Sequence, residues 1–566
     1  MRPAVAFALA LTALSARAQQ PPQPRKHAPG PTSPAITPAD AMTRLYVIAD
    51  DSMLGRDAGT IGNFKATTYI ANEVKRLGLE PAGEGGSYFQ TVPLLNVRLD
   101  PGSHVVADRT PLEFVRDVTA PIPDLRWRVR PFDNATAIYG GKLGDTSSYI
   151  TPALAAGKVV VVRLDTNARG QAVTPALYAL RRPGGRYFDA AAVVGVSPFP
   201  QGLRMFTAAF MDRWATAFYS AEPPDTAHVA PVLVMTRGSA QRLFSSPLES
   251  LRPGTTGNAL HGNLAYSVRD TAPARNVIAV LRGGDPALRG EYVAIGAHSD
   301  HVGTRNVLLD HDSVRVFNRM FRTLGARDEP PMLDAGQAAR LRAALDSVRR
   351  LRPARLDSIY NGADDDGSGT AALLEIAEAF ATTRVRPRRS ILFVWHTAEE
   401  GNLNGSRWFT SHPTVPIDSI VAQLQMDHVS RGRAEDTPGG GPRYVAIVTP
   451  RDGRPTFADA IDSANAAATW GFDIDWSRGR ADAVGGSVAC GSDHAAYDRF
   501  GVPTAFFFTG FHVDYHQVTD EPQYSDYDKL AHVAQFVHDV ALRIANANTP
   551  PPRVSLIPGG RTACVP

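Results

Sequence analysis

Short apolar runs without alternation recur along the chain and predict buried strands. They are YVAIGA at 292–297, ILFVW at 391–395, VAIV at 445–448 and AFFF at 505–508. Runs of this kind suit strands that are covered on both faces, as in a largely parallel sheet. Between the first two runs, the segment 370–380 places Leu373, Ala377 and Phe380 on one helical face. The pattern therefore predicts an α/β fold.

The stretch 105–267 has a different pattern and predicts a small separate domain. It contains VVVVRL after Lys158, AAAVVGVSP at 190–198 and APVLVMTRGSAQRLF at 230–244. We interpret these as strands separated by turns and one or two helices. The α/β pattern resumes at Asn276, so we expect one larger domain, formed by residues 38–104 and 268–546, with the smaller domain inserted into it.

A second, Arg-rich insertion occupies residues 304–360 and predicts one helix. Asp334 can cap this helix, because Gln337 follows three residues later, and Pro353 stops it. Its apolar stripe consists of Leu341, Leu345 and Val348. We expect this insertion to be a solvated excursion of the surface rather than a binding device.

Both ends of the chain are expected to lie outside the packed domains. Residues 1–18 combine Arg2, an apolar stretch and the small residues of Ala16-Arg17-Ala18, which is typical of a signal peptide. The stretch is well short of the roughly 20 residues that span a bilayer, so we expect export to the periplasm or the exterior and no stable membrane insertion. The Pro-rich residues 19–37 predict an extended linker, and 547–566 predict a tail of the same character.

Length, charge and cysteine content limit the function only broadly. A chain of 566 residues predicts two or three domains. The formal net charge of +3 gives no electrostatic reason to propose a nucleic-acid partner. In an exported protein Cys490 and Cys564 could pair, which would tie the tail to the larger domain, but the sequence does not decide this.

Five potential metal ligands follow apolar runs or occupy a Gly-rich turn. Because ligands of open α/β sheets gather beyond the carboxyl ends of the strands, all five could meet in one cleft. Two imidazoles and three carboxylates suit borderline or hard divalent ions without any thiolate. Each motif alone is weak evidence, and the conjunction is what carries the prediction. The five residues are His298, Asp365, Glu400, Asp427 and His516.

The neighbouring pair Glu399 and Glu400 suggests a division of roles. Two cations a few ångströms apart repel each other, so a bridging carboxylate is needed between them. Together they can lower the pKa of a water and polarise a carbonyl group. A separate carboxylate must then take the proton of the water and deliver it to the leaving group. One glutamate of the pair could bind metal while the other moves the proton.

The chain resembles peptidase family M28, a family of zinc aminopeptidases. The matching motifs are GAHSDHVG, IYNGADDDGSGTAALLEIA, WHTAEEGNLNGS, LQMDHVS and DYHQVTD. The resemblance covers about 38–104 and 268–546, and the insert between them resembles a protease-associated (PA) domain. It implies a three-layer α/β/α domain with a mixed, mostly parallel sheet, the zinc exopeptidase fold, together with a β-rich inserted PA domain. The spacing from His298 to Asp365 is longer than is typical of the family, because of the Arg-rich insertion.

The resemblance also implies a role for each site residue. His298 and Asp427 would bind one zinc ion, Glu400 and His516 the other, and Asp365 would bridge the two. Glu399 would be the general base, and Tyr515 would donate to the oxyanion. Asp300 would hold the His298 imidazole, and Asp493 would support the site. His301, His396 and His428 are interpreted as supporting or structural, and a cis peptide bond is implied after Asp365.

The function predicted in this way is that of an exported dinuclear-zinc exopeptidase acting on peptides, of aminopeptidase type. Co²⁺ or Mn²⁺ could replace Zn²⁺. A carboxypeptidase or dipeptidase of the same fold and a glutaminyl cyclase are the alternatives, and a non-catalytic binding protein is a further one. The sequence leaves the oligomeric state and the preferred side chain open.

Overall fold

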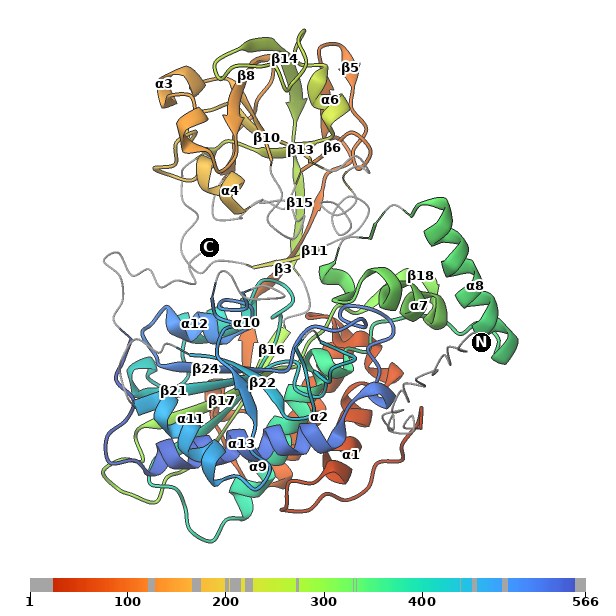
Figure 1. Cartoon of the computed structure of the whole chain (residues 1–566). Coiled ribbons are helices and arrows are strands. Elements are labelled where there is room, and N and C mark those ends of the chain that lie inside the picture. The colour runs from red at the N-terminus through yellow and green to blue at the C-terminus, as the bar shows by residue number, and fades with distance from the viewer. Residues whose placement is uncertain are drawn as a thin grey trace, which may run out of the picture.

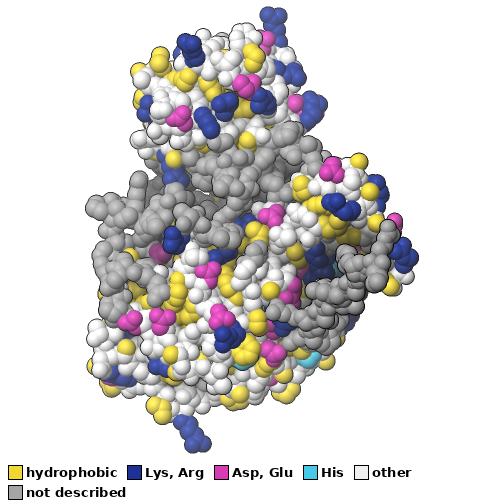
Figure 2. All heavy atoms as spheres, in the orientation of Figure 1, with side chains coloured by type: hydrophobic (Ala, Val, Ile, Leu, Met, Phe, Trp, Pro, Cys, Tyr) yellow, Lys and Arg dark blue, Asp and Glu magenta, His cyan; other side chains and the backbone are white. Residues whose placement is uncertain are grey.

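The computed structural model shows a large α/β lobe that carries a smaller β-rich lobe and a helical side unit (Figure 1). It describes residues 24–554 apart from 121–127, 165–174, 199–202, 204–214, 219–227, 271–273, 329, 332, 438, 450–455 and 481–486. The predicted signal peptide, 1–18, and the last residues of the predicted tail, 555–566, lie outside the described residues. On the face drawn in Figure 2, basic and acidic side chains are interspersed.

A nine-stranded sheet forms the centre of the large lobe. The apolar runs at 292–297, 391–395, 445–448 and 505–508 all lie in its strands, as predicted. In spatial order its strands are β1 (Glu80–Pro81), β16 (Ala274–Leu281), β20 (Ser390–His396), β17 (Tyr292–His298), β21 (Ile420–Met426), β24 (Thr504–Phe508), β22 (Tyr444–Val448) and β23 (Asp473–Asp475), while β2 (Phe89–Val92) pairs with β16.

The sheet is parallel at its centre and mixed toward its edges. Strands β20, β17, β21 and β24 run parallel to one another, whereas β16 and β22 pair with them in the antiparallel sense. Parallel and antiparallel pairs are equal in number in the described sheet, so it is mixed as predicted, with its parallel pairs at the centre and between β22 and β23 at one edge. The carboxyl ends of the four central strands consequently share one edge.

Helices cover both faces of this sheet, which gives the three layers that the resemblance implied. The larger core joins one face to a group of long helices, and a second core joins the other face to two short ones. The first group comprises α1 (Pro38–Ile48), α2 (Ile61–Arg76), α9 (Gly369–Thr382), α11 (Thr456–Ala467) and α13 (Tyr527–Asn546). The second comprises α10 (Asn404–Ser411), which contributes Phe409, and α12 (His494–Asp498), which contributes Tyr497.

The smaller lobe is built around an eight-stranded sheet of its own. Two cores, one on each side of the parallel strands β8, β9 and β10, fill it. Its strands in spatial order are β5 (Thr110–Pro111), β4 (His104–Ala107), β14 (Thr256–Asn263), β8 (Ala135–Lys142), β9 (Val159–Arg163), β10 (Ala192–Val196), β13 (Val232–Met235) and β6 (Val118–Thr119). Its helices are α3 (Pro152–Ala155), α4 (Pro175–Arg181) and α6 (Arg237–Gln241), and β7 (Arg128–Val129) pairs with β12 (His228–Val229). A separate inserted lobe is therefore present, and its identity as a PA domain stays a prediction.

A three-stranded sheet connects the two lobes (Figure 1). The chain leaves the large lobe along β3 (Leu94–Leu99) and returns along β15 (Tyr266–Asp270), which pairs with β3 in the antiparallel sense. The third strand is β11 (Ala215–Phe218). The predicted boundary at 104/105 falls inside β4, and the one at 267/268 falls inside β15.

The Arg-rich insertion folds as a side unit with two helices rather than one. Strands β18 (Thr304–Asp310) and β19 (Leu356–Ile359) pair at its base, and α7 (His311–Phe321) lies beside α8 (Ala335–Leu351). The capping box of Asp334 and Gln337 is present as predicted. Helix α7 was not predicted, and it is the helix that packs toward the large lobe, where Asn318 Nδ2 donates to the Val513 carbonyl over 2.8 Å.

The described part of the predicted linker follows the large lobe instead of standing away from it. The Thr32 hydroxyl donates to Glu378 over 2.6 Å, and His27 lies 3.1 Å from the Thr43 hydroxyl. Glu378 also pairs with the fully buried Arg44 of α1, whose guanidinium contacts Glu73 and Glu375 as well. At the other end, the Val554 N–H donates to the Gly501 carbonyl, so residues up to 554 lie against the lobe.

Two further expectations concern the ends and surface of the chain. Among the described residues, no helix combines the length and apolar character needed to cross a bilayer. Cys490 is not a free thiol. Its predicted partner, Cys564, lies outside the described residues, so that pairing stays a prediction.

Candidate metal centre

The five predicted ligands lie beyond the carboxyl ends of the parallel strands. His298 ends β17, Glu400 follows β20, and Asp427 follows β21 directly. Asp365 lies in the turn 363–368 that opens α9, and His516 lies in the loop after β24. Because the strands are parallel, these segments share one edge of the sheet, and the structure brings all five side chains together.

Three of the ligands form a first group. The Nε2 atom of His298 lies 3.3 Å from Asp365 Oδ1 and 3.5 Å from Asp427 Oδ1. All three residues are buried. The Nδ1 atom of His298 lies 3.2 Å from the carbonyl oxygen of Asp300. An Nδ1–H that donates to this carbonyl leaves the Nε2 lone pair directed at the two carboxylates, as a metal-binding imidazole requires.

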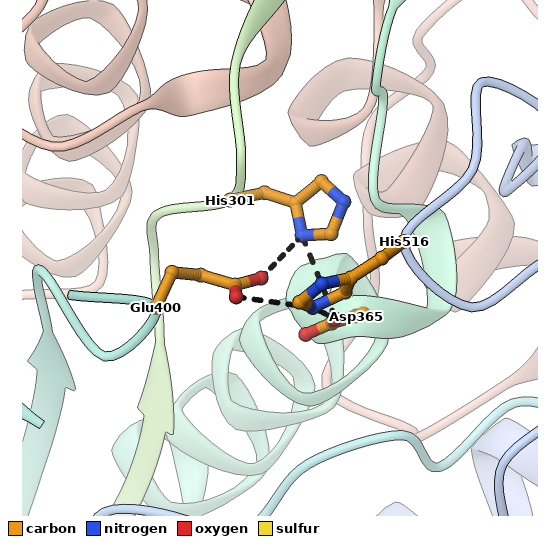
Figure 3. A group of neighbouring side chains, drawn as sticks. All are labelled: His301, Asp365, Glu400 and His516. Atoms are coloured by element: carbon orange, nitrogen blue, oxygen red, sulfur yellow. Dashed lines mark ion pairs between the residues drawn. The ribbon is translucent and has the colours of Figure 1, made fainter. Parts of the chain in front are cut away.

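The second group adds a residue that the sequence had not singled out as a ligand. His516 Nε2 lies 2.9 Å from Asp365 Oδ2 and 3.0 Å from Glu400 Oε2. His301 Nδ1 lies 2.7 Å from Glu400 Oε1 and 3.6 Å from Asp365 Oδ2. Figure 3 shows the four side chains, from four separate segments, pointing toward one another. Asp365 is common to both groups, as a bridging residue would be.

Five of the atoms that face each other in these groups have a property in common. They are buried and lack a hydrogen-bond partner within the described protein. Buried polar atoms without a partner are costly, and a divalent cation would satisfy them through nitrogen and oxygen ligands. The site therefore fits two cations that share Asp365. The atoms are His298 Nε2, His301 Nδ1, Asp365 Oδ2, Glu400 Oε1 and Asp427 Oδ1.

The charged side chains in the two groups strongly shift one another's pKa values. Burial opposes ionisation of Asp365, but His428 and His301 outweigh it, so the pKa of Asp365 lies well below its usual range. For Glu400, burial and Asp365 raise the pKa, and His516 and His301 lower it, with a net value of about 2. Both carboxylates are thus ionised at neutral pH, which is the form that binds metal.

Aspartate side chains that accept from backbone N–H groups hold the turn that carries Asp365. The peptide bond between Asp365 and Asp366 is cis, as the resemblance implied. Asp520 accepts the N–H groups of Asp364 and Asp365 over 3.1 Å, and Asp366 accepts the N–H of His298 over 2.9 Å. Gly362 has a φ of 55°, and a Cβ there would meet the His301 ring at 2.4 Å. Glycine therefore lets His301 reach the second group.

Arg56 connects the first segment of the large lobe to these loops. It is fully buried, and its guanidinium donates only to backbone carbonyls among the hydrogen bonds observed. The acceptors include Ser299 at 3.1 Å, Asn361 at 2.6 Å and Gly362 at 2.9 Å. Arg56 thus holds the loop after β17 and the turn before α9 in one arrangement, a role that the sequence did not reveal.

Glu399, the predicted general base, lies beside the ligands but belongs to neither group. Its Oε2 is 3.9 Å from His298 Nε2, and its backbone N–H donates to Asp300 Oδ1 over 3.1 Å. Burial raises the pKa of Glu399 well above its usual range, although His298 acts in the opposite direction. A carboxylate with a raised pKa that borders the pocket can accept a proton and release it again.

The remaining predicted residues lie around the groups. The Asp300 carboxylate is 3.6 Å from His298 Nδ1, so its carbonyl oxygen makes the closer contact with that imidazole. Asp493 is buried and accepts from Gln425 over 3.3 Å, and burial raises its pKa to about 7. His396 lies 3.1 Å from the Tyr497 hydroxyl, away from the cluster. His428 Nε2 lies 3.6 Å from both Asp365 and Asp427, so it faces the first group.

A pocket opens onto the ligands. Its polar lining residues include the carboxylates of the two groups together with Glu399, His428 and His516. Its apolar lining residues include Phe511, and the Tyr515 ring contacts residues of both kinds, with its centre 4.0 Å from that of His516 and 4.7 Å from that of Phe511. The other lining residues are Arg327, Ser487, Val488, Gly491, Phe506 and Phe508.

A comparison with protein families agrees with the fold and the site described above. Residues 276–541 match the model of peptidase family M28. Over these residues the chain is therefore similar to peptidase family M28, as the resemblance predicted, and the paired clusters lie within the matched residues.

Known proteins add a likeness of fold and of sequence. The fold is similar to that of an aminopeptidase from Aneurinibacillus sp. strain AM-1, with 15% identity, a TM-score of 0.50, and coverage of 92% of this chain and 96% of that one. Leucine aminopeptidase 1 of Sclerotinia sclerotiorum is 32% identical over 29% of this chain and 40% of its own length. Leucine aminopeptidase 1 of Ajellomyces capsulatus is 26% identical over 36% of this chain and 52% of its own. The chain thus spans about half, or less, of the length of these two leucine aminopeptidases.

Proposed function

We propose that this protein is an exported exopeptidase with two zinc ions that removes residues from the amino end of peptides. The observation that carries the proposal is the pair of clusters joined by Asp365, in which five buried ligand atoms have no hydrogen-bond partner among the described residues. The similarity to peptidase family M28, which spans these residues, supports the same conclusion. Zn²⁺ suits the mixed nitrogen and oxygen ligands, and Co²⁺ or Mn²⁺ are alternatives.

We assign the residues to the two proposed ions from the grouping of their ligand atoms. His298 and Asp427 would hold one ion, Glu400 and His516 the other, and Asp365 would contact both. His301 fits the second ion as well, because its Nδ1 lies as close to Glu400 as the His516 nitrogen does. The two bound ions would polarise the peptide carbonyl and lower the pKa of the attacking water.

The protein's own residues move the proton. Glu399 borders the pocket and coordinates neither ion in this assignment, so its carboxylate takes the proton of the attacking water and passes it to the leaving amine. The hydrogen bond that the Glu399 N–H donates to Asp300 holds the backbone that carries this carboxylate. Tyr515, whose pKa burial raises well above its usual range, stays protonated and can donate its O–H to the oxyanion.

The assignment to the aminopeptidase type rests on relatives and on the pocket. Both relatives described above are named leucine aminopeptidases. The apolar lining residues of the pocket can accept an apolar side chain next to the cleaved bond. They are Val488, Phe506, Phe508 and Phe511. The inserted lobe would limit access to short peptides or free chain ends.

The test is hydrolysis of peptides blocked at one end, by zinc-loaded mature protein with a chelated control. Release of amino-terminal residues that is abolished by the chelator and by N-acetylation is the expected result. Cleavage that survives N-acetylation and stops on C-terminal amidation would indicate a carboxypeptidase. Ammonia release from Gln-peptides would indicate a glutaminyl cyclase, and peptide capture without turnover a binding protein.

A further inference from the structure

One basic side chain enters the pocket from the Arg-rich insertion. Among the described residues that line the pocket, Arg327 is the one arginine or lysine, and the other charged groups are the carboxylates and imidazoles of the metal centre. Arg327 ends the single 3₁₀ turn Gly325–Arg327, between α7 and α8. The insertion is therefore part of the pocket wall, which corrects the expectation of a solvated excursion.

The turn is fixed to the loop that carries the ligand His516. The Ala326 N–H donates to the Tyr515 carbonyl over 3.0 Å. Gly325 has a φ of 59°, and a Cβ there would approach the Tyr515 carbonyl oxygen to 2.6 Å, so the two backbones touch. Arg315 of α7 adds an ion pair to Asp514 at 3.0 Å. These contacts set the position of Arg327 relative to the metal centre.

The guanidinium lies over an aromatic ring of the pocket. Its Cζ atom is 4.2 Å from the ring centre of Phe511, which meets the Tyr515 ring edge-on. A cation–π contact of this kind is favourable and limits where the guanidinium can lie. A half-buried guanidinium beside the apolar residues of a pocket favours an anionic group with the planar geometry of a carboxylate, because its forked N–H donors match the two oxygens.

We propose that Arg327 is a specificity residue that binds a carboxylate of the substrate close to the cleaved bond. The inference rests on the proposed function and names a substrate class for it. The carboxylate has two possible sources. It can be the carboxyl terminus of a dipeptide, or it can be the side chain of an aspartate or glutamate at the residue held in the pocket.

Matched substrate pairs measure this preference. The first pair is Leu-Ala and Leu-Ala amide, which differ in the terminal carboxylate. The second is Glu-Ala amide and Gln-Ala amide, which differ in the side chain. The zinc-loaded protein is expected to show a kcat/KM about 10- to 100-fold higher for the carboxylate member of one pair, the range that a charge-assisted hydrogen bond supplies. The pair that responds identifies the source.

Substitution of the guanidinium assigns the preference to Arg327. Arg327→Gln is expected to abolish the preference and to leave kcat/KM for the uncharged member within about 2-fold. Arg327→Lys keeps the charge without the planar fork, and should retain part of the preference. Arg305 provides the matched control, because it lies in the same insertion and over a ring, Tyr360, at 5.3 Å, but does not line the pocket. Arg305→Gln should behave as the unaltered protein does.

The outcomes separate this proposal from the proposed function. Equal losses for both members of a pair, or no preference in the unaltered protein, would overturn the role of Arg327 while hydrolysis itself continues. If no peptide is hydrolysed, calorimetric binding of the same four compounds to zinc-loaded Glu399→Gln protein still tests it. Tighter binding of a carboxylate member that Arg327→Gln removes would support the proposal, and equal binding would refute it.

Discussion

The carboxylate of Asp300 accepts a hydrogen bond from the backbone N–H of Glu399, with 3.1 Å between the two atoms. The same residue contacts the His298 imidazole through its carbonyl oxygen. One residue thus orients a ligand of the first ion and the group proposed to move the proton. The contact with His298 is buried and the contact with Glu399 is partly buried, so water competes little with them.

Removal of the Asp300 carboxylate is expected to lower kcat/KM by about 10- to 100-fold, because the Glu399 carboxylate loses its fixed position. Asp300→Ala deletes the acceptor, whereas Asp300→Asn keeps an amide oxygen that can accept the Glu399 N–H. Steady-state hydrolysis by the two variants checks this. Equal losses in both would mean that the charge of Asp300, and not this hydrogen bond, is what matters.

Glu399→Gln is expected to lower kcat by about 10²- to 10⁴-fold, because it removes the proton acceptor. The zinc content should stay at two ions per chain, since Glu399 belongs to neither ligand group. Elemental analysis together with turnover measures both quantities. Near-normal turnover with two ions bound would show that another group is the base.

Asp365→Asn is expected to impair binding of both ions, because this carboxylate is shared between the two groups. Comparison with Glu399→Gln is informative, because Asp365→Asn should lose bound metal whereas Glu399→Gln should lose only turnover. Zinc titration in a competing chelator gives the affinities. Two ions bound with unchanged affinity would contradict the bridging role.

His301→Ala tests the ligand that the sequence did not predict. If His301 binds the second ion, its loss should weaken one zinc affinity by at least about 10-fold and leave the other unchanged. Spectra of the Co²⁺-substituted protein report the change in coordination independently of activity. His396→Gln is the control, because that buried imidazole contacts Tyr497 instead. Unchanged affinity and spectra would return His301 to a structural role.

Asp498 provides a prediction on pH and stability away from the metal centre. Burial raises its pKa to about 6, against a hydrogen bond from Thr504 that lowers it. Because the folded pKa lies above the usual value of 3.8 for an aspartate, the folded state binds the extra proton. Stability should therefore fall as pH rises from about 4 to 6. Asp498→Asn should remove this pH-dependent loss, which raises the free energy of unfolding at pH 7 by up to about 3 kcal/mol. Near pH 3 the substitution should have little effect on the free energy of unfolding. Urea unfolding at several pH values measures the difference, and a pH-independent effect would contradict the assignment.

The sequence predicted the site well where ligands follow strands. The unbroken apolar runs locate β17, β20 and β24, and parallel strands bring their carboxyl ends to one edge. The sequence could therefore place His298 and Glu400 together, and Asp427 follows a less continuous apolar segment that forms β21. Asp365 and His516 depended more on the family resemblance, because turns and long loops have no periodicity that fixes where a side chain points.

The residues that were missed act through contacts distant in sequence. His301 is three residues from His298, and only the tight approach at Gly362 directs it to the second group. Arg56 acts through the carbonyls of a turn more than 300 residues away. Helix α7 and the position of Arg327 depend on packing against the loop that ends in His516. Local patterns do not contain such information.

The hydrogen-bonded pairing of β3 with β15 determines how the inserted lobe is attached to the large lobe. Leu99 and Tyr266 face each other across the two strands, so the chain enters and leaves the inserted lobe at neighbouring positions. A third strand, β11, pairs with the other side of β3. The free energy needed to close a loop grows only slowly with its length, so an insert of this size costs the large lobe little more than a short one. The large lobe could therefore gain, lose or exchange this insert by changes confined to these three strands, while its own sheet and metal centre stay as they are.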